Sequence, residues 1–163
     1  MPHDPRALNT IDYQRAAALI GHEANGSAAG MQFVVDQAAG ERRTAQLLLA
    51  TIDCYRIVTD ELRTPGALMA VWQLIEQETR RRPDNGDARR AATAIVARRD
   101  TDTDAFNAVL LEANEVGRPF ELLASVVGIY SAILPELATP HATAHLAQWT
   151  ARIIGRGDTA AGA

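Results

Sequence analysis

Apolar side chains recur along much of this chain at spacings of three and four residues, which is the period of an amphipathic α-helix. One such stripe consists of Met31, Val34, Val35 and Ala38, and a longer one of Leu48, Ile52, Tyr55, Val58 and Leu62. No segment shows the sustained two-residue alternation of a half-buried strand. The pattern therefore predicts an all-α fold.

The sequence Glu-Leu-Arg-Thr-Pro at 61–65 returns as Glu-Leu-Ala-Thr-Pro at 136–140, 75 positions later. Residues 12–67 and 87–142, compared without a gap, are identical at sixteen of 56 positions, and only four of these are alanine pairs. In each copy we expect the Thr to cap the next helix and the Pro to occupy its first turn. The matches predict a tandem duplication.

The duplication predicts a first helical repeat at 1–82, a second at 83–155 and a disordered tail at 156–163. Each repeat would hold four helices, giving about eight in a pseudo-twofold helical bundle. A unit of roughly 75 residues is marginally stable by itself, so we expect the repeats to share one core.

Residues that favour caps mark the expected helix ends. Thr10 and Asn85 are predicted N-caps of the first helix in each repeat. Asn25-Gly26-Ser27 is expected to end that helix and to cap the next one. Gly40 and Gly117 follow the second helix, where a left-handed residue often ends a helix.

The composition and charge of the chain disfavour several classes of function. The 163 residues carry a net charge of −4, and all sixteen cationic side chains are Arg, so a general attraction to nucleic acid or anionic membrane is disfavoured. The only cysteine, Cys54, cannot form an internal disulfide, and we expect it to be a small core residue. The start of the sequence shows no apolar core of the kind that a signal peptide has, and the longest apolar run, 122–135, is too short to span a membrane. We therefore expect a cytoplasmic protein.

The two copies differ most in their third helix. Asp53, Arg56 and Asp60 in the first copy correspond to uncharged residues in the second copy. The third helix of the second copy is therefore apolar on nearly every side. Such a helix is either central or partly covered by another subunit. Its small residues favour an internal helix crossing and, as the alternative, predict an interaction face with another subunit; the face comprises Ala124, Gly128, Ser131 and Ala132.

Other side chains suggest sites of different chemistry. Arginine clusters predict a phosphate-binding stripe as an alternative, formed by Arg80, Arg81, Arg82, Arg89 and Arg90. Aromatic residues predict, as a further alternative, a ligand pocket between the repeats, lined by Tyr55, Tyr130, Trp72 and Trp149. His141 and His145 are four residues apart and form a weak metal-ligand pair without an obvious third ligand.

From these features we expect a non-catalytic helical module that binds a protein partner or a second copy of itself, and that needs no cofactor. The alternatives are an Arg-mediated nucleic-acid-binding or regulatory protein, and a small-ligand binder or enzyme with its pocket between the repeats. None of the sequence motifs selects a catalytic residue.

Overall fold

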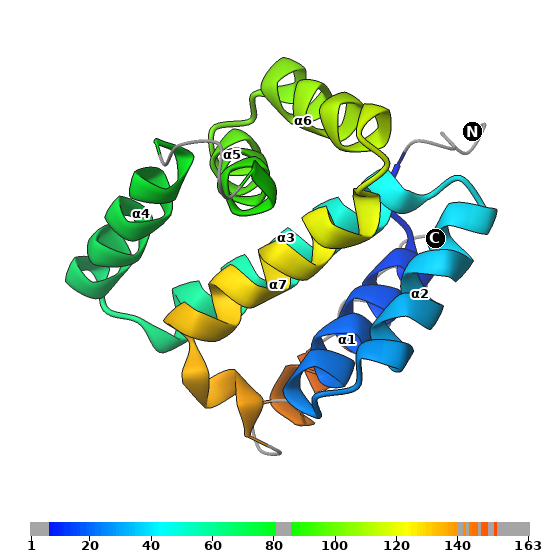
Figure 1. Ribbon diagram of the computed structural model, residues 1–163. Helices are drawn as coiled ribbons and strands as arrows, with labels where there is room; N and C mark the ends of the chain where they lie inside the picture. Colours follow the sequence, from blue (N-terminus) through cyan, green and yellow to red (C-terminus); the bar gives the residue numbers. More distant parts are fainter. Residues whose placement is uncertain are drawn as a thin grey trace, which may run out of the picture. The chain divides into compact units, whose positions relative to one another are not determined.

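The computed structural model describes residues 7–80 and 86–139, together with residues 142, 144–146, 148–149 and 152. This part of the chain contains helices and no strand, which confirms the predicted all-α helical bundle (Figure 1). The elements are α1 (Thr10–Ala24), α2 (Ala28–Gly40), α3 (Thr44–Leu62), α4 (Pro65–Thr79), α5 (Gly86–Arg99), α6 (Thr103–Glu115), α7 (Pro119–Ile133) and the short 3-10 helix η2 (Pro135–Ala138).

The chain divides into two compact units. One comprises Met1–Cys54 with Glu136–Ala163, and the other comprises Tyr55–Pro135. The division falls inside α3, whereas the repeats predicted at 1–82 and 83–155 follow sequence similarity. The repeat boundaries and the duplication therefore stay hypotheses about the origin of the sequence.

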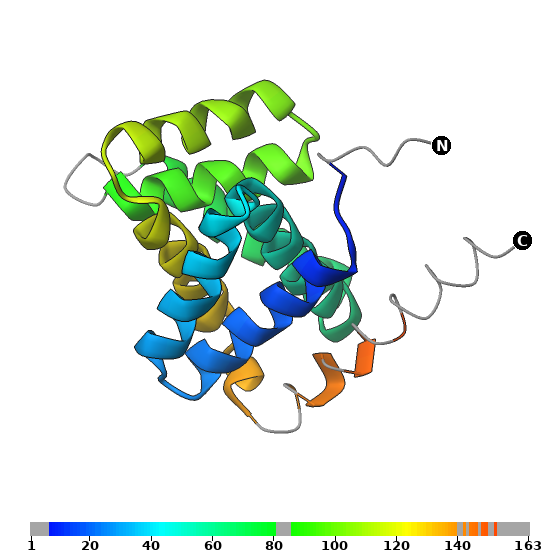
Figure 2. The same ribbon diagram turned by 90° about the vertical axis from the view of Figure 1, so that its right-hand side faces the viewer.

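In the first unit, α1 and α2 lie side by side and are joined by a short turn (Figures 1 and 2). Asn25 caps the end of α1, Gly26 has a φ of 66°, and Ser27 caps α2, as predicted. The predicted stripe of α2, Met31, Val34, Val35 and Ala38, is buried.

The predicted cap at Thr10 is wrong, because Asn9 occupies that position and Thr10 is the first helical residue. The Asn9 side chain accepts a hydrogen bond from the Asp12 backbone N–H (3.1 Å). The Asp12 carboxylate in turn accepts one from the Asn9 backbone N–H (2.9 Å). This reciprocal pair forms a capping box and satisfies two N–H groups that a helix start leaves open. Asn85, the other predicted cap, lies outside the described residues.

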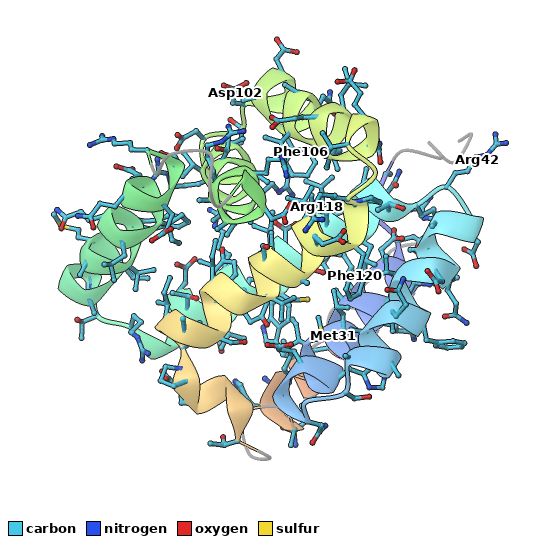
Figure 3. The ribbon with its side chains drawn as sticks, viewed as in Figure 1. Met31, Arg42, Asp102, Phe106, Arg118 and Phe120 are labelled. Carbon is cyan, nitrogen blue, oxygen red and sulfur yellow. The ribbon has the colours of Figure 1, made fainter. Side chains whose placement is uncertain are left out.

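The left-handed residue after α2 is also not the predicted glycine. Gly40 is the last residue of the helix, and Arg42 adopts a φ of 58° two residues later. The Arg42 side chain extends away from the helices (Figure 3). After α6 the prediction is confirmed, since Gly117 has a φ of 68°.

In the second unit, α5 packs against α4, α6 and α7 (Figures 1 and 2). Four of the buried residues of α5 are alanines, and their small side chains allow close packing by several helices. The corner between α3 and α4 forms as predicted: Thr64 Oγ1 accepts a hydrogen bond from the Ala67 N–H (3.4 Å), and Pro65 is the first residue of α4. Thr139 Oγ1 likewise accepts one from the Ala142 N–H (3.3 Å), while Pro140 lies outside the described residues.

Several local backbone features recur at the interval of 75 residues. Positive φ angles occur at Gly26 and Thr101 (66° and 55°), and Ser27 and Asp102 cap the helices that follow them. α2 and α6 begin and end at corresponding positions. The duplication hypothesis predicts such matches.

Candidate interaction surface

The arginines predicted to bind phosphate lie close to carboxylates at the start of α5. Arg90 is 8% exposed and donates hydrogen bonds to Asp87 Oδ1 (2.7 Å) and Glu112 Oε1 (2.9 Å). Arg89 also donates to Glu112 Oε1 (2.8 Å), and Arg118 donates to Asp87 Oδ2 (2.7 Å; Arg118 is labelled in Figure 3). The predicted set thus contributes two of the cations in an internal ion-pair cluster.

The ion pairs also favour ionisation of the two acids. Hydrogen bonding from Arg118, with a further contribution from Arg90, lowers the pKa of Asp87 even though burial acts in the opposite direction. Hydrogen bonding from Arg90 is the main reason that the pKa of Glu112 is lowered. Both acids therefore stay charged at neutral pH and compensate the arginine charges.

The other arginines of the predicted stripe are not part of this cluster. Arg80 is exposed at the C-terminal end of α4, and Arg81 and Arg82 lie outside the described residues. The described structure therefore joins Arg89 and Arg90 through a shared acid and places Arg80 on another element.

A second ion-pair cluster lies in the first unit and includes residues that match Asp87 and Arg118 at the interval of 75 positions in the sequence. Arg43 donates through Nε to Asp12 Oδ1 (2.8 Å), and Asp12 is completely buried. Arg15 donates to Glu41 Oε2 (2.9 Å). Burial raises the pKa of Asp12, but the hydrogen bonds from Arg43 and the Asn9 backbone outweigh that effect, and the net shift is downward. Asp12 and Arg43 are each 75 positions before Asp87 and Arg118, so matched residues form matched ion pairs.

Two of the four aromatic residues predicted to line a pocket stack on each other. The rings of Tyr55 and Tyr130 have centroids 4.4 Å apart and planes 7° apart, and both residues are 1% exposed. Trp72 is half-buried and contacts Arg99, whose guanidinium carbon lies 4.8 Å from the ring centroid. Trp149 is half-buried in the other unit. The tyrosine pair thus forms part of the core of its unit.

The small residues predicted as an interaction face lie on α7, whose buried side is formed by Leu122, Leu123, Val126, Val127 and Tyr130. Ala124, Gly128 and Ser131 are half-buried, and Ala132 is exposed. A methyl group added to Gly128 would meet no described atom within 4 Å. A close helix crossing at Gly128 is therefore not present in the described structure, and the role of this face as an interface stays a prediction.

The remaining chemical candidates are the predicted histidine pair and Cys54. His145 is exposed, and His141 lies outside the described residues. Among the residues that the structure describes, no group of three or more His, Cys, Asp or Glu side chains is placed to hold a metal ion. Burial, with a contribution from the charge of Asp53, raises the pKa of Cys54 to about 12. Cys54 is fully buried, as expected of a core residue.

Helix α4 carries an exposed surface that the sequence analysis did not select. Its inner side is anchored by Val71 and Ile75, which are buried. Every residue of α4 lies in the described part of the chain, and none of its exposed residues is charged. We call this surface the α4 strip; it consists of Pro65, Gly66, Met69, Ala70, Gln73, Leu74 and Gln77.

The two large apolar residues of the α4 strip are well exposed, Met69 at 65% and Leu74 at 53%. The sequence contains a signal for this surface, because the eleven residues from Pro65 to Ile75 include no charge. A stripe of buried residues defines only one side of a helix, so helical periodicity does not reveal this surface.

Large apolar side chains are also exposed on other helices. Phe33 on α2 is 61% exposed, and Leu111 on α6 is 60% exposed. Their surroundings are less uniform than the α4 strip, because the exposed residues of α2 include Asp36 and those of α6 include Asp104 and Glu115.

Comparison with known proteins found no matching family model and no curated protein or solved structure with significant similarity to this chain. Within the described residues, no helix is both long enough and apolar enough to cross a lipid bilayer.

Proposed function

We propose that this protein is a non-catalytic helical interaction module that acts in the cytoplasm and binds a protein partner or its own copy through exposed apolar helix faces. The α4 strip is the observation that carries this proposal. Isolated apolar residues are common on protein surfaces, whereas a contiguous uncharged apolar surface is typical of an interaction site. Met69 and Leu74 are both more than half exposed, on opposite sides of the α4 strip.

The energetics favour a macromolecular partner for this surface. Complete burial of a Met or Leu side chain contributes about 1.5–3 kcal/mol. Because Met69 and Leu74 are already partly covered, a partner gains only a part of that contribution at each residue. Useful affinity therefore requires a partner that covers the whole α4 strip at once, as another protein surface can.

The charge distribution supports protein binding over the nucleic-acid alternative. Arg89 and Arg90 of the predicted stripe are both ion-paired with Glu112. Phosphate binding gains affinity from cations that release counterions, and a carboxylate already paired with these cations competes with phosphate. The Arg cluster therefore provides a weaker basis for function than the α4 strip.

Photo-crosslinking in the source cell tests the interaction module. A photoreactive amino acid replaces Met69, Phe33 or Leu111 in separate full-length variants, and Asp104 serves as an exposed control position. We expect protein adducts from position 69, with fewer or none from position 104. If none of the three apolar positions gives more protein adduct than the control, the proposal is wrong.

A further inference from the structure

The turn that joins α1 to α2 (Figure 1) carries the sequence Asn25-Gly26, and both residues are exposed. Asn25 is the C-cap of α1, and Gly26 follows it with a φ of 66°. A β-carbon added at Gly26 would meet no described atom within 4 Å. Solvent therefore reaches both residues, and no side chain at position 26 shields the peptide nitrogen between them.

This pair of residues permits an internal reaction of the asparagine side chain. The peptide nitrogen of Gly26, after it loses its proton, attacks Cγ of Asn25, and the new N–Cγ bond closes a five-membered succinimide ring. The side-chain nitrogen takes up a proton and leaves as ammonia. Water then opens the ring at either carbonyl, so that position 25 becomes aspartate or isoaspartate. A β-carbon at position 26 would hinder the attack, and glycine has none.

The folded turn holds the two reacting atoms in an unreactive arrangement. The Gly26 N–H donates a hydrogen bond to the Glu23 carbonyl (2.9 Å), and Asn25 Nδ2 donates one to the Gly21 carbonyl (2.8 Å). The ψ of Asn25 is 3°, which places the Gly26 nitrogen beside the backbone nitrogen of Asn25 rather than beside its Cβ. Ring closure requires the Gly26 nitrogen to lie beside Cβ, so Asn25 reacts only after the turn opens.

We propose that Asn25 is a site of spontaneous deamidation whose rate is set by opening of the α1–α2 turn, and that the product weakens this turn. Helix ends fray more readily than helix interiors, and local opening needs less free energy than global unfolding. The hydrogen bonds that protect Asn25 both lie at such an end, so the reactive conformation forms without unfolding of the core. The modification does not depend on the interaction proposed for the α4 strip.

The turn between α5 and α6 shows what a carboxylate needs at the corresponding position. Asp100 lies 75 positions after Asn25, and the backbone N–H of each residue donates to the carbonyl four residues earlier (2.9 Å for Asp100 and 3.1 Å for Asn25). The Asp100 carboxylate accepts hydrogen bonds from Arg99 Nε (2.7 Å) and Nη2 (3.0 Å). The residue that corresponds to Arg99 is Ala24, so a carboxylate at position 25 would lack this neighbouring cation.

Deamidation therefore removes stabilising contacts at position 25. The product has no amide nitrogen to donate to the Gly21 carbonyl. Its negative charge lies at the C-terminal end of α1, where the helix dipole disfavours an anion. Isoaspartate also inserts the side-chain methylene into the main chain, and so lengthens the turn before the cap at Ser27.

Peptide mapping of the full chain by mass spectrometry tests the site. The purified protein is incubated in mildly alkaline buffer, folded or in denaturing urea, and then digested with trypsin. The peptide 16–42 contains Asn25 as its only asparagine and should gain the mass that replacement of NH2 by OH produces. Labelling by protein isoaspartate methyltransferase detects the isoaspartate product.

We expect deamidation of Asn25 to be slower in the folded protein than in urea. In the folded protein it should be faster at Asn25 than at Asn107, which is exposed within α6 and precedes Ala108. The inference is wrong if Asn25 reacts no faster than Asn107 in the folded protein. Equal rates at Asn25 in the folded and denatured protein would also overturn it.

A rate that depends on opening should respond to the stability of the turn. Ser27→Ala removes the hydrogen bond that the Ser27 hydroxyl accepts from the Gly30 N–H (3.2 Å) and leaves both reacting atoms in place. Deamidation at Asn25 should accelerate by up to about fivefold, the factor that corresponds to the ~1 kcal/mol contribution of a Ser cap. Thr64→Ala removes the cap of α4 and is the matched control, which should leave the rate unchanged. An unchanged rate in Ser27→Ala, or equal acceleration in both variants, would contradict control by this turn.

Asn25→Asp reproduces one product of the reaction and isolates its effect. The thermal midpoint measured by circular dichroism should fall by about 1–4 °C, because an anion at a helix C-terminus is unfavourable. The double variant Ala24→Arg/Asn25→Asp copies the sequence of residues 99–100 and should recover most of this loss. A midpoint that does not fall in Asn25→Asp, or that falls equally in the double variant, would overturn the weakening of the turn.

Discussion

Asp87 holds two arginines at the start of α5, one of them buried. Its carboxylate accepts hydrogen bonds from Arg90 (2.7 Å) and Arg118 (2.7 Å). Asp87→Asn removes the charge and leaves the buried Arg90 with Glu112 as its acidic partner. We expect a loss of about 1–3 kcal/mol in the free energy of unfolding, measured by urea denaturation.

Asp100→Asn is the matched control for that measurement, because Asp100 pairs with Arg99 at a more exposed position. Solvent screens an exposed pair strongly, so the control should lose less stability than Asp87→Asn. Equal losses in the two variants would show that Asp87 acts as a surface ion pair.

The lowered pKa values of Asp12 and Asp87 predict a specific dependence of stability on pH. Each carboxyl has a folded-state pKa below the ordinary value of an Asp side chain, so it contributes stability above that ordinary value. This contribution is lost as the pH falls through the lower folded-state pKa. Stability measured by urea denaturation should therefore decrease below about pH 4, and the double variant Asp12→Asn/Asp87→Asn should show a smaller decrease. An unchanged slope would assign the acid sensitivity to other groups.

Arg42 has a backbone conformation that is unfavourable for its residue type. Its φ of 58° lies in the left-handed region, where a side chain costs about 1–2 kcal/mol relative to glycine. The counterpart 75 residues later is Gly117, with a φ of 68°. Arg42→Gly should raise the thermal midpoint and Gly117→Ala should lower it, as measured by circular dichroism. A lower midpoint for Arg42→Gly would mean that the arginine side chain contributes more than its backbone strain costs.

The sequence predicted where the helices are interrupted better than it predicted which residue caps or ends each helix. Asn25-Gly26-Ser27 could be recognised because each residue type suits its position. The sequence does not distinguish Thr10 from Asn9 as the cap, since both residue types can cap a helix and only the geometry shows which side chain accepts from the Asp12 N–H. Arg42 could not be predicted, since its residue type disfavours the left-handed conformation that it adopts.

At the scale of single elements, the corner between α3 and α4 depends on the cap at Thr64. Thr64→Ala removes the hydrogen bond from the Ala67 N–H to Oγ1 (3.4 Å) and should cost about 1 kcal/mol. Thr64→Ser keeps the hydroxyl and should retain most of that stability. Hydrogen exchange gives the local measurement: the Ala67 amide should exchange faster in the Ala variant than in the Ser variant. Equal rates in both variants would contradict a capping role.

The position of α4 in the fold was predictable only in part. Its buried side follows from helical spacing, because Val71 and Ile75 are four residues apart and therefore lie on one face of the helix. Exposure of Met69 and Leu74 could not be derived in the same way. An apolar residue outside the main stripe is buried or exposed according to whether another helix covers it, and that depends on tertiary packing.

At the scale of the molecule, sequence similarity and compactness divide the chain differently. The predicted first repeat ends at residue 82, yet α4 packs on α5, the first helix of the predicted second repeat. A sequence comparison detects which segments resemble each other, whereas packing depends on which apolar faces meet. The unit from Tyr55 to Pro135 is therefore built from parts of both predicted repeats.

The charge distribution of the molecule predicts the outcome of a direct test for nucleic-acid binding. With a net charge of −4, and with Arg89 and Arg90 paired to Glu112, the protein should leave the mobility of duplex DNA unchanged even at low salt. Electrophoretic mobility measured over a series of salt concentrations checks this expectation. A salt-sensitive shift that Arg89→Ala abolishes would instead favour the Arg-mediated alternative, because it would show that phosphate displaces the carboxylate from these arginines.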